Sequence, residues 1–279
     1  MPTERKLTYG KETGFRDLET EKVFADIGDA EQGNKDLNVV NVPSAYQKTE
    51  GVFSYDIVCV ISGGTERERT FLNELEKKRT FQRLEVIFVS TPKGEGGLTP
   101  KMMDSVYQKI CVNGVLIAGN RRIQLEDVDM VYMFTDVDHY EEELRSILAT
   151  QQDDEPAWII SNPDFEIWIY YCYRNNPHEE LREVIEAIPS ARSSLLKTIN
   201  GRFNNGGGLD TRKAFEHLED GIAHSKEHHS ASDGIPNLLS TLMHVFAEDV
   251  LKRLGDEYHA FLQKKQEFRN KYTSSDKLL

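Results

Sequence analysis

The sequence predicts an α/β fold: a parallel sheet flanked by helices, with a helical C-terminal part. Short apolar runs rich in β-branched residues, such as 57–61, are typical of strands buried on both faces. These runs alternate with polar, helix-like segments, as they do in parallel sheets. After Ser161 the strand-like runs stop and helix-like segments follow one another.

Residues 1–52 are predicted to form a polar N-terminal extension. Glycine and aspartate cluster in it, and its apolar run at 37–42 is short. A segment of this composition buries little apolar surface, so we expect it to be partly disordered or to lie over the main domain.

Residues 53–175 are predicted to form the α/β core. Thr99 before Pro100 has the pattern of a helix N-cap followed by proline at the first helical position. Gly119-Asn120 lies between two apolar stretches and is compatible with the turn of a small hairpin. The expected strands are 57–61, 84–89, 130–135 and 156–160, and the expected helices are 65–78, 100–110, 139–149 and 164–174.

Residues 176–279 are predicted to form a helical C-terminal region. A glycine-rich loop at 204–208 interrupts it. The expected helices are 178–187, 191–199, 210–223, 235–254 and 256–271.

Composition limits the partners and the compartment. The formal net charge is −13, whereas proteins that hold duplex DNA by charge alone usually have a basic surplus. Nucleic acid stays a candidate partner if metal ions, basic patches or a partner subunit supply positive charge. The sequence has no apolar run of the roughly 20 residues that a membrane helix needs, and no apolar stretch of a signal peptide near Met1. The three cysteines are interpreted as reduced core residues. We therefore predict a cytoplasmic protein without a membrane partner.

Two predicted strands end in residues that suit chemistry. Ser62-Gly63-Gly64-Thr65-Glu66 permits a tight turn into a helix, and Asp136 and Asp138 leave a buried strand together. Ligands of open parallel sheets bind outside the carboxyl ends of the strands. Paired carboxylates are suited to Mg²⁺, which prefers hard oxygen ligands and relieves their mutual repulsion. The pair Asp127 and Asp129 has the same spacing but precedes the strand, and no role is assigned to it.

These features together resemble the RloB-like proteins, a branch of the Toprim superfamily. The resemblance includes the Gly-Gly-Thr-Glu turn, Asp136-Val137-Asp138 and, most specifically, the segment 161–168, Ser-Asn-Pro-Asp-Phe-Glu-Ile-Trp. It covers about residues 55–250 and implies a Toprim-like sheet. It also implies a Mg²⁺- or Mn²⁺-dependent nuclease of bacterial anti-phage defence or restriction-associated systems, often beside a partner ATPase.

The resemblance also assigns residues. Asp136 and Asp138 would be metal ligands, and Asn162 and Glu166 would line the cleft as substrate-binding residues. The family has Glu-Gly after the first strand, where this chain has Ser62-Gly63. Glu66 is therefore the expected third metal ligand or general acid/base, and Glu68 is expected to face solvent. In the structural alternative, Asn162 caps a helix and Glu166 satisfies the backbone or a buried arginine.

Two functions from different classes follow. The first is a metal-dependent nuclease acting on nucleic-acid phosphodiesters through Glu66, Asp136 and Asp138. The second is a catalytically impaired Toprim subunit that senses nucleic acid or regulates a partner ATPase, which Ser62 and the acidic charge favour. Homo-oligomerisation and the type of nucleic acid are left open.

Two further groups have a functional and a structural interpretation. Histidines 224, 228 and 229 have near-helical spacing that suits Zn²⁺, but a polar solvent-facing stretch is favoured. Four aromatic residues suit base stacking, but a core role is favoured; they are Trp158, Trp168, Tyr170 and Tyr171.

Overall fold

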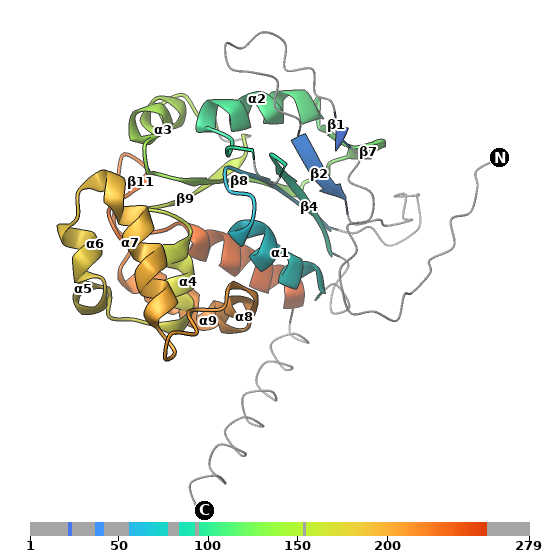
Figure 1. The fold of residues 1–279 in the computed structure, drawn as a ribbon. Coiled ribbons are helices and arrows are strands. Elements are labelled where there is room, and N and C mark those ends of the chain that lie inside the picture. The colour runs from blue at the N-terminus through green and yellow to red at the C-terminus, as the bar shows by residue number, and fades with distance from the viewer. Residues whose placement is uncertain are drawn as a thin grey trace, which may run out of the picture.

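The computed structural model describes residues 22–23, 37–41, 56–77, 84–92, 95–152 and 155–255. Figure 1 shows a central sheet between two layers of helices. The predicted α/β class is confirmed in this part of the chain, with a parallel sheet of four strands flanked by helices.

The main sheet has the strand order β1-β2-β4-β3-β8-β9. Its parallel strands are β4 (Leu84–Ser90), β3 (Asp56–Ser62), β8 (Met130–Asp136) and β9 (Ala157–Ser161). The segment predicted as an N-terminal extension adds β1 (Lys22–Val23) and β2 (Leu37–Asn41), and β2 pairs antiparallel with β4. The other residues of 1–52 lie outside the described part.

The helical layer on one face of the sheet includes the helix whose N-cap was predicted at Thr99. Thr99 Oγ1 accepts a hydrogen bond from the Met102 amide, so α2 (Pro100–Ile110) begins as predicted. The hairpin at Gly119-Asn120 is also confirmed: β6 (Val115–Ala118) and β7 (Arg121–Gln124) pair antiparallel, and β5 (Cys111–Val112) pairs with β6. These elements and α3 (Glu141–Leu148) cover one face of the sheet (Figure 1).

The opposite face is covered by α1 (Arg67–Lys77), α4 (Glu166–Tyr173) and the segments that follow α4. Those segments are α5 (Pro177–Glu180), α6 (Arg182–Glu186), α7 (Pro189–Arg202), α8 (Thr211–Ala214), the 3₁₀ turn η1 (Phe215–His217), α9 (Leu218–Glu227), the pair β10 (Ala231–Ser232) and β11 (Ile235–Pro236), and a helix over 243–255. No helix in the described residues is long and apolar enough to cross a lipid bilayer.

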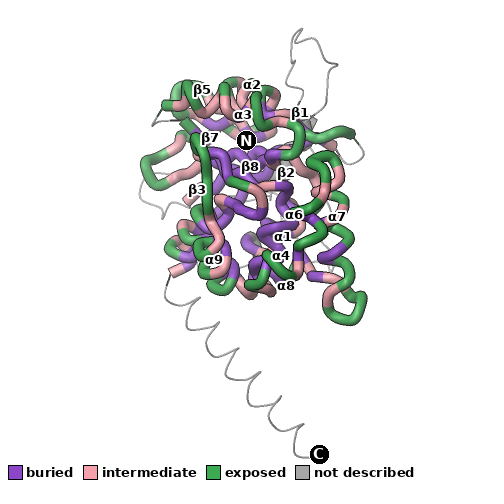
Figure 2. Tube along the Cα trace, turned by 90° about the vertical axis from the view of Figure 1, so that its left-hand side faces the viewer, coloured by how far each residue is buried: buried purple, intermediate pink, exposed green. Residues whose placement is uncertain are grey.

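The apolar strands are buried on both faces, as Figure 2 shows by the purple centre of the molecule. Side chains alternate across a strand, so Val58 and Val60 pack toward α1 and α4. The alternate residues of the same strand, Ile57 and Cys59, pack toward α2 and α3. The period of two therefore divides β3 between two apolar clusters.

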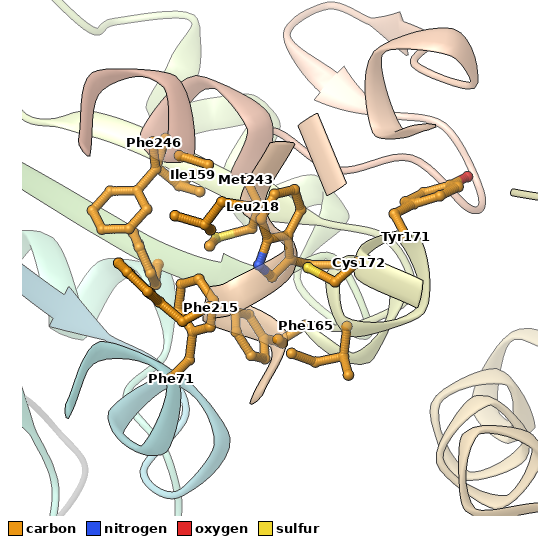
Figure 3. Packing of buried hydrophobic residues seen from close by; sticks show 14 of the residues in the cluster. Phe71, Ile159, Phe165, Tyr171, Cys172, Phe215, Leu218, Met243 and Phe246 are labelled. Carbon is orange, nitrogen blue, oxygen red and sulfur yellow. The ribbon is translucent and has the colours of Figure 1, made fainter. Parts of the chain in front are cut away.

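The cluster on the α1/α4 face joins the predicted core to the C-terminal region. Phe71 of α1 packs edge-on to Trp168 of α4, and Phe246 packs edge-on to Phe134 of β8. Figure 3 shows side chains of α1, of α4 and of the C-terminal region packed together, with Phe215 and Met243 among them. The four aromatic residues that suited base stacking are buried, which confirms the core interpretation.

Three predicted C-terminal helices differ from the structure. The segment 210–223 is divided into α8, the 3₁₀ turn η1 and α9, which continues to Glu227. The segment 178–187 is broken at Leu181 into α5 and α6. The segment 235–254 is not one helix, because Ile235 and Pro236 form β11 and helix begins only at 243. The prediction for 256–271 falls outside the described residues.

The connections give the sheet a switch point at its carboxyl end. From β3 the chain runs through α1, on one face, to β4, which is the neighbour of β3 on one side. It then returns to β8, the neighbour on the other side, which is followed by α3 on the opposite face. Adjacent strands whose helices leave to opposite faces form a topological switch point, the usual ligand site of an open α/β sheet.

Candidate metal and catalytic site

The floor of the candidate site is the carboxyl end of β3 and β8. Ser62 pairs with Phe134, and the Gly63 amide donates to the Phe134 carbonyl at 2.8 Å, so the two strand ends stay in register. Side-chain alternation puts Ser62 and Asp136 on the face that carries α1 and α4, because Val60 and Phe134 lie there. Asp136 is partly buried at this end.

Asp164 and Glu166 enter from the neighbouring strand β9. They follow Ser161, whose Oγ lies 2.8 Å from Thr241 Oγ1, and Glu166 opens α4. Asn200 of α7 donates to the Glu166 carbonyl at 2.9 Å. Both acidic residues are buried, Asp164 at 1% and Glu166 at 3% exposure.

Glu68 enters from α1 and is 7% exposed. It stands in the first turn of the helix, where a carboxylate is favoured by the unpaired amides. Its carboxylate folds back over Gly64: a β-carbon on Gly64 would lie 2.0 Å from Glu68 Oε1. The prediction that Glu68 faces solvent is therefore wrong.

Two cations accompany these acids. Lys197 Nζ, from α7, lies 3.3 Å from Asp164 Oδ2 and 3.9 Å from Glu166 Oε1, and it also interacts electrostatically with Asp136 and Glu68. Arg67 Nε lies 3.7 Å from Glu166 Oε1, and Arg67 Nη1 donates to Thr211 Oγ1 at 3.3 Å. Both basic side chains are about half exposed, at 50% for Lys197 and 51% for Arg67.

The acids disfavour one another's charge. Burial, followed by the charges of Asp164, Glu68 and Glu166, raises the pKa of Asp136 well above its usual value. Burial and Glu166 do the same to the pKa of Asp164, against the opposing effect of Lys197. Burial raises the pKa of Glu68 to about 7, although a bond from its own backbone amide lowers it. Concentrated buried acidity of this kind is typical of functional sites.

Several of these oxygens have no hydrogen-bond partner. Among the described residues, Asp164 Oδ1, Glu166 Oε1 and the buried Ser62 Oγ have no hydrogen-bond partner, and the ammonium nearest to Asp164 Oδ2 is that of Lys197, at 3.3 Å. Buried polar atoms are nearly always hydrogen-bonded, so an unpaired set suggests a missing ligand. Hard carboxylate oxygens that repel one another fit Mg²⁺ chemically.

Within the described ranges, however, no three Asp, Glu, His or Cys side chains already form a group that could hold a metal ion. The donors are of the right type for Mg²⁺, but the carboxylates would have to reorient to share one ion.

The structure brings together two of the predicted site residues, Asp136 and Glu166. Glu66 is exposed and precedes α1, which begins at Arg67. Asp138 is 33% exposed, with Oδ1 3.6 Å from His139 Nε2. Asn162 donates through Nδ2 to the Pro236 carbonyl at 2.8 Å and holds the 236–240 segment. It does not cap α4, whose N-cap is Phe165, so the capping role expected of it is wrong. The arginine expected beside Glu166 is present as Arg67, which is half exposed and not buried.

Three residues of the cluster were missed. Asp164 lies inside the segment 161–168, and its acidity next to Glu166 was an available signal. Glu68 needed the correct phase of α1. Lys197 comes from a helix about thirty residues after β9, and nothing in its local sequence points to the site.

The histidine group does not form a metal site in the part of the chain described. His224 Nδ1 lies 2.8 Å from the Tyr171 carbonyl, and His228 Nε2 lies 3.0 Å from Asn175 Oδ1. The His229 ring packs against His244 instead, with centroids 5.0 Å apart.

Comparison of the chain with protein-family models, with curated proteins and with solved structures finds no match. The assignment of a function therefore depends on the residues of this site and on the resemblance seen in the sequence.

Proposed function

We propose that this chain is a Toprim-type, Mg²⁺- or Mn²⁺-dependent nuclease that cuts nucleic-acid phosphodiesters. Following the resemblance, its setting would be a bacterial anti-phage defence or restriction-associated system in the cytoplasm, with a partner ATPase and self-association as candidate interactions. The metal-binding residues would be Asp136, Asp164 and Glu166 at the switch point between β3 and β8.

The observation that carries the proposal is that acidic residues from separate elements have one cation in common. Asp136, Asp164, Glu166 and Glu68 come from β8, the β9–α4 connection, α4 and α1, and each interacts electrostatically with Lys197. A position that one ammonium ion shares with these carboxylates is a position where a divalent cation would be stabilised strongly. A core built only for stability would leave these oxygens hydrogen-bonded.

The chemistry can be divided among the residues. A bound divalent ion would polarise the scissile phosphate and lower the pKa of an attacking water. Lys197 is half exposed and reaches the carboxylates from the solvent side, so its ammonium would stabilise negative charge on the phosphate. Arg67 stands beside it and would position a flanking phosphate through its planar fork of donors.

The other predicted residues have outer positions in this proposal. Asp138 would act as an outer ligand reached from the surface, because its side chain is partly exposed just beyond Asp136. Glu66 would contact solvent or substrate at the entrance, since it is exposed. Asn162 would contribute by holding the 236–240 segment beside the acids.

A second function has its own support. A catalytically impaired Toprim subunit, which senses nucleic acid or regulates an ATPase, would explain serine at position 62 and the net charge of −13. In that case metal ions would bind weakly or not at all.

The test is a nuclease assay on plasmid DNA, single-stranded DNA and total tRNA with Mg²⁺ or Mn²⁺, with and without a candidate ATPase. We expect metal-dependent cleavage that disappears in Asp136→Asn. Absence of cleavage on every substrate, together with an unchanged melting temperature on adding metal, would reject the nuclease and favour the regulatory subunit.

A further inference from the structure

The end of β3 has no carboxylate of its own. Ser62 is fully buried there, on the same face as Asp136, and its Oγ has no partner among the described residues. Gly63 and Gly64 follow it. β3 therefore supplies a hydroxyl beside Asp136 but no carboxylate.

The space beside this strand end is filled by the carboxylate of Glu68. A β-carbon on Gly64 would meet Glu68 Oε1 at 2.0 Å and both Cδ and Oε2 at 2.3 Å. The carboxylate therefore lies against the main chain of the turn. Its charge acts on Asp136, and that of Glu166 acts on it in turn.

The backbone conformation at position 64 does not require glycine. Gly64 is not among the glycines with positive φ, so an alanine would adopt the same backbone conformation. What an alanine would take away is the room for Glu68.

We propose that Glu68 is a metal ligand supplied by α1 in place of a residue on β3, and that Gly64 is glycine so that this carboxylate can reach Asp136. The inference rests on the proposed metal site and adds to it a ligand and the residue that gives it room. The independent sign that a cation belongs there is that two buried oxygens at the same cluster, Ser62 Oγ and Asp164 Oδ1, have no hydrogen-bond partner among the described residues.

The test measures Mn²⁺ binding by calorimetry on the full-length, chelator-treated protein, so that it does not depend on turnover. We expect Glu68→Gln to weaken binding by about tenfold or more, in the range seen when groups around a metal are removed. Gly64→Ala should weaken it by a similar factor without changing any ionisable group. Gly201→Ala is the matched control, because no atom lies within 4 Å of a β-carbon there.

Glu66→Gln distinguishes Glu68 from its exposed neighbour Glu66, and we expect this variant to bind Mn²⁺ with wild-type affinity. Wild-type affinity in Glu68→Gln, with the loss in Glu66→Gln instead, would overturn the inference. Wild-type affinity in Gly64→Ala would overturn the role given to that glycine.

The reference variant is Asp136→Asn. If it loses binding while Glu68→Gln keeps it, the metal site stands and Glu68 is not part of it. If the wild-type protein binds no Mn²⁺, the proposed function fails first and the inference with it. Folding is checked by the melting temperature of each metal-free variant, which Glu68→Gln should raise because it removes a buried, repelled charge.

Discussion

Acidic residues lie at both ends of the parallel sheet, but their hydrogen bonding differs between the two ends. At the amino end, Asp129 accepts bonds from the Ile57 amide at 2.7 Å and from the Glu126 amide at 2.8 Å. At the carboxyl end, Asp164 is more deeply buried, but its Oδ1 has no hydrogen-bond partner among the described residues and its Oδ2 faces only the Lys197 ammonium, at 3.3 Å.

The basic residues follow the same division. Arg253 at the amino end donates to Asp249 at 2.6 Å and to the Val128 carbonyl at 2.6 Å, and it lies 3.4 Å from Asp56. Lys197 at the carboxyl end is half exposed and lies at longer distances from its acids, 3.3 Å from Asp164 Oδ2 and 3.9 Å from Glu166 Oε1.

The comparison teaches that the spacing of acids does not identify a site. Asp127-Val128-Asp129 and Asp136-Val137-Asp138 have the same residue types at the same spacing. They differ in what surrounds them: Asp129 accepts two backbone hydrogen bonds, whereas Asp136 lies among other buried acids, and burial together with their charges raises its pKa.

The largest change in stability is expected at the amino end of the sheet, where Asp129 is hydrogen-bonded. Asp129→Ala should lower the free energy of unfolding by about 2–4 kcal/mol, because it leaves the buried Ile57 amide unpaired. Urea denaturation measures this, and Mg²⁺ should not reverse it. Asp127→Ala, at an exposed position two residues away, is the control and should change stability by less than about 0.5 kcal/mol.

Removal of a carboxylate at the carboxyl end of the sheet should instead stabilise the metal-free protein. Asp164→Asn should raise the stability of the metal-free protein by about 1–3 kcal/mol at pH 8, because it removes one of several buried charges that repel. It should also abolish stabilisation by Mg²⁺. A loss of stability in this variant would show that the two ends do not differ in the way described.

Lys197→Met tests the shared cation. Without Lys197, repulsion among the acids is uncompensated, so the metal-free protein should lose up to about 1 kcal/mol at pH 8, because the lysine is half exposed. Addition of Mg²⁺ should recover most of this loss in thermal denaturation. Arg253→Met is the matched change at the amino end, where we expect a loss that Mg²⁺ does not recover.

The pH dependence follows from Glu68. Its pKa is raised in the folded protein from an ordinary value of 4.5 to about 7, so folding favours the protonated form. Metal-free protein should therefore be most stable below about pH 4.5 with respect to this group, and should lose stability as pH rises to about 7. We expect a fall in melting temperature on the order of 3–6 °C. In Glu68→Gln the fall should be smaller, and an unchanged profile would contradict the assignment.

The smallest effect is expected at the surface of the site. Asp138→Asn should change stability by less than about 0.5 kcal/mol, because the side chain is partly exposed. It should weaken Mn²⁺ binding by only a few-fold, well below the effect of Asp136→Asn. Equal losses in the two variants would make Asp138 an inner ligand.

Much of the core could be predicted because its strands are buried on both faces. A continuous β-branched run such as 57–61 is too short for a typical helix and too apolar for a surface loop, which leaves a buried strand. The segment 235–254 was predicted wrongly because a two-residue strand and the turn after Pro236 have no distinct apolar period. Strand order, and with it the switch point, depends on connections that no local pattern encodes.

In the candidate site, the strand-borne Asp136 was predictable and the helix-borne residues were not. Helix α1 begins at Arg67 and not at Thr65. Glu66 therefore precedes the helix and is exposed, while Glu68, in the first turn, is buried, and which side of α1 faces the sheet is set by tertiary packing. Lys197 depends on how α7 packs against α4, which is a tertiary contact.

The apolar layer beneath the sheet has a consequence for how the chain is made. Tyr132 and Phe134 pack against Phe246, more than a hundred residues later in synthesis. While the first 175 residues leave the ribosome, the buried face of α4, with Trp168 and Tyr171, lacks the partners that cover it. The nascent chain therefore cannot cover this face of the sheet until the C-terminal helices have been synthesised. The protein should acquire its native structure only after the segment 196–254 has emerged, and holding chaperones would be needed longest for the residues around α4.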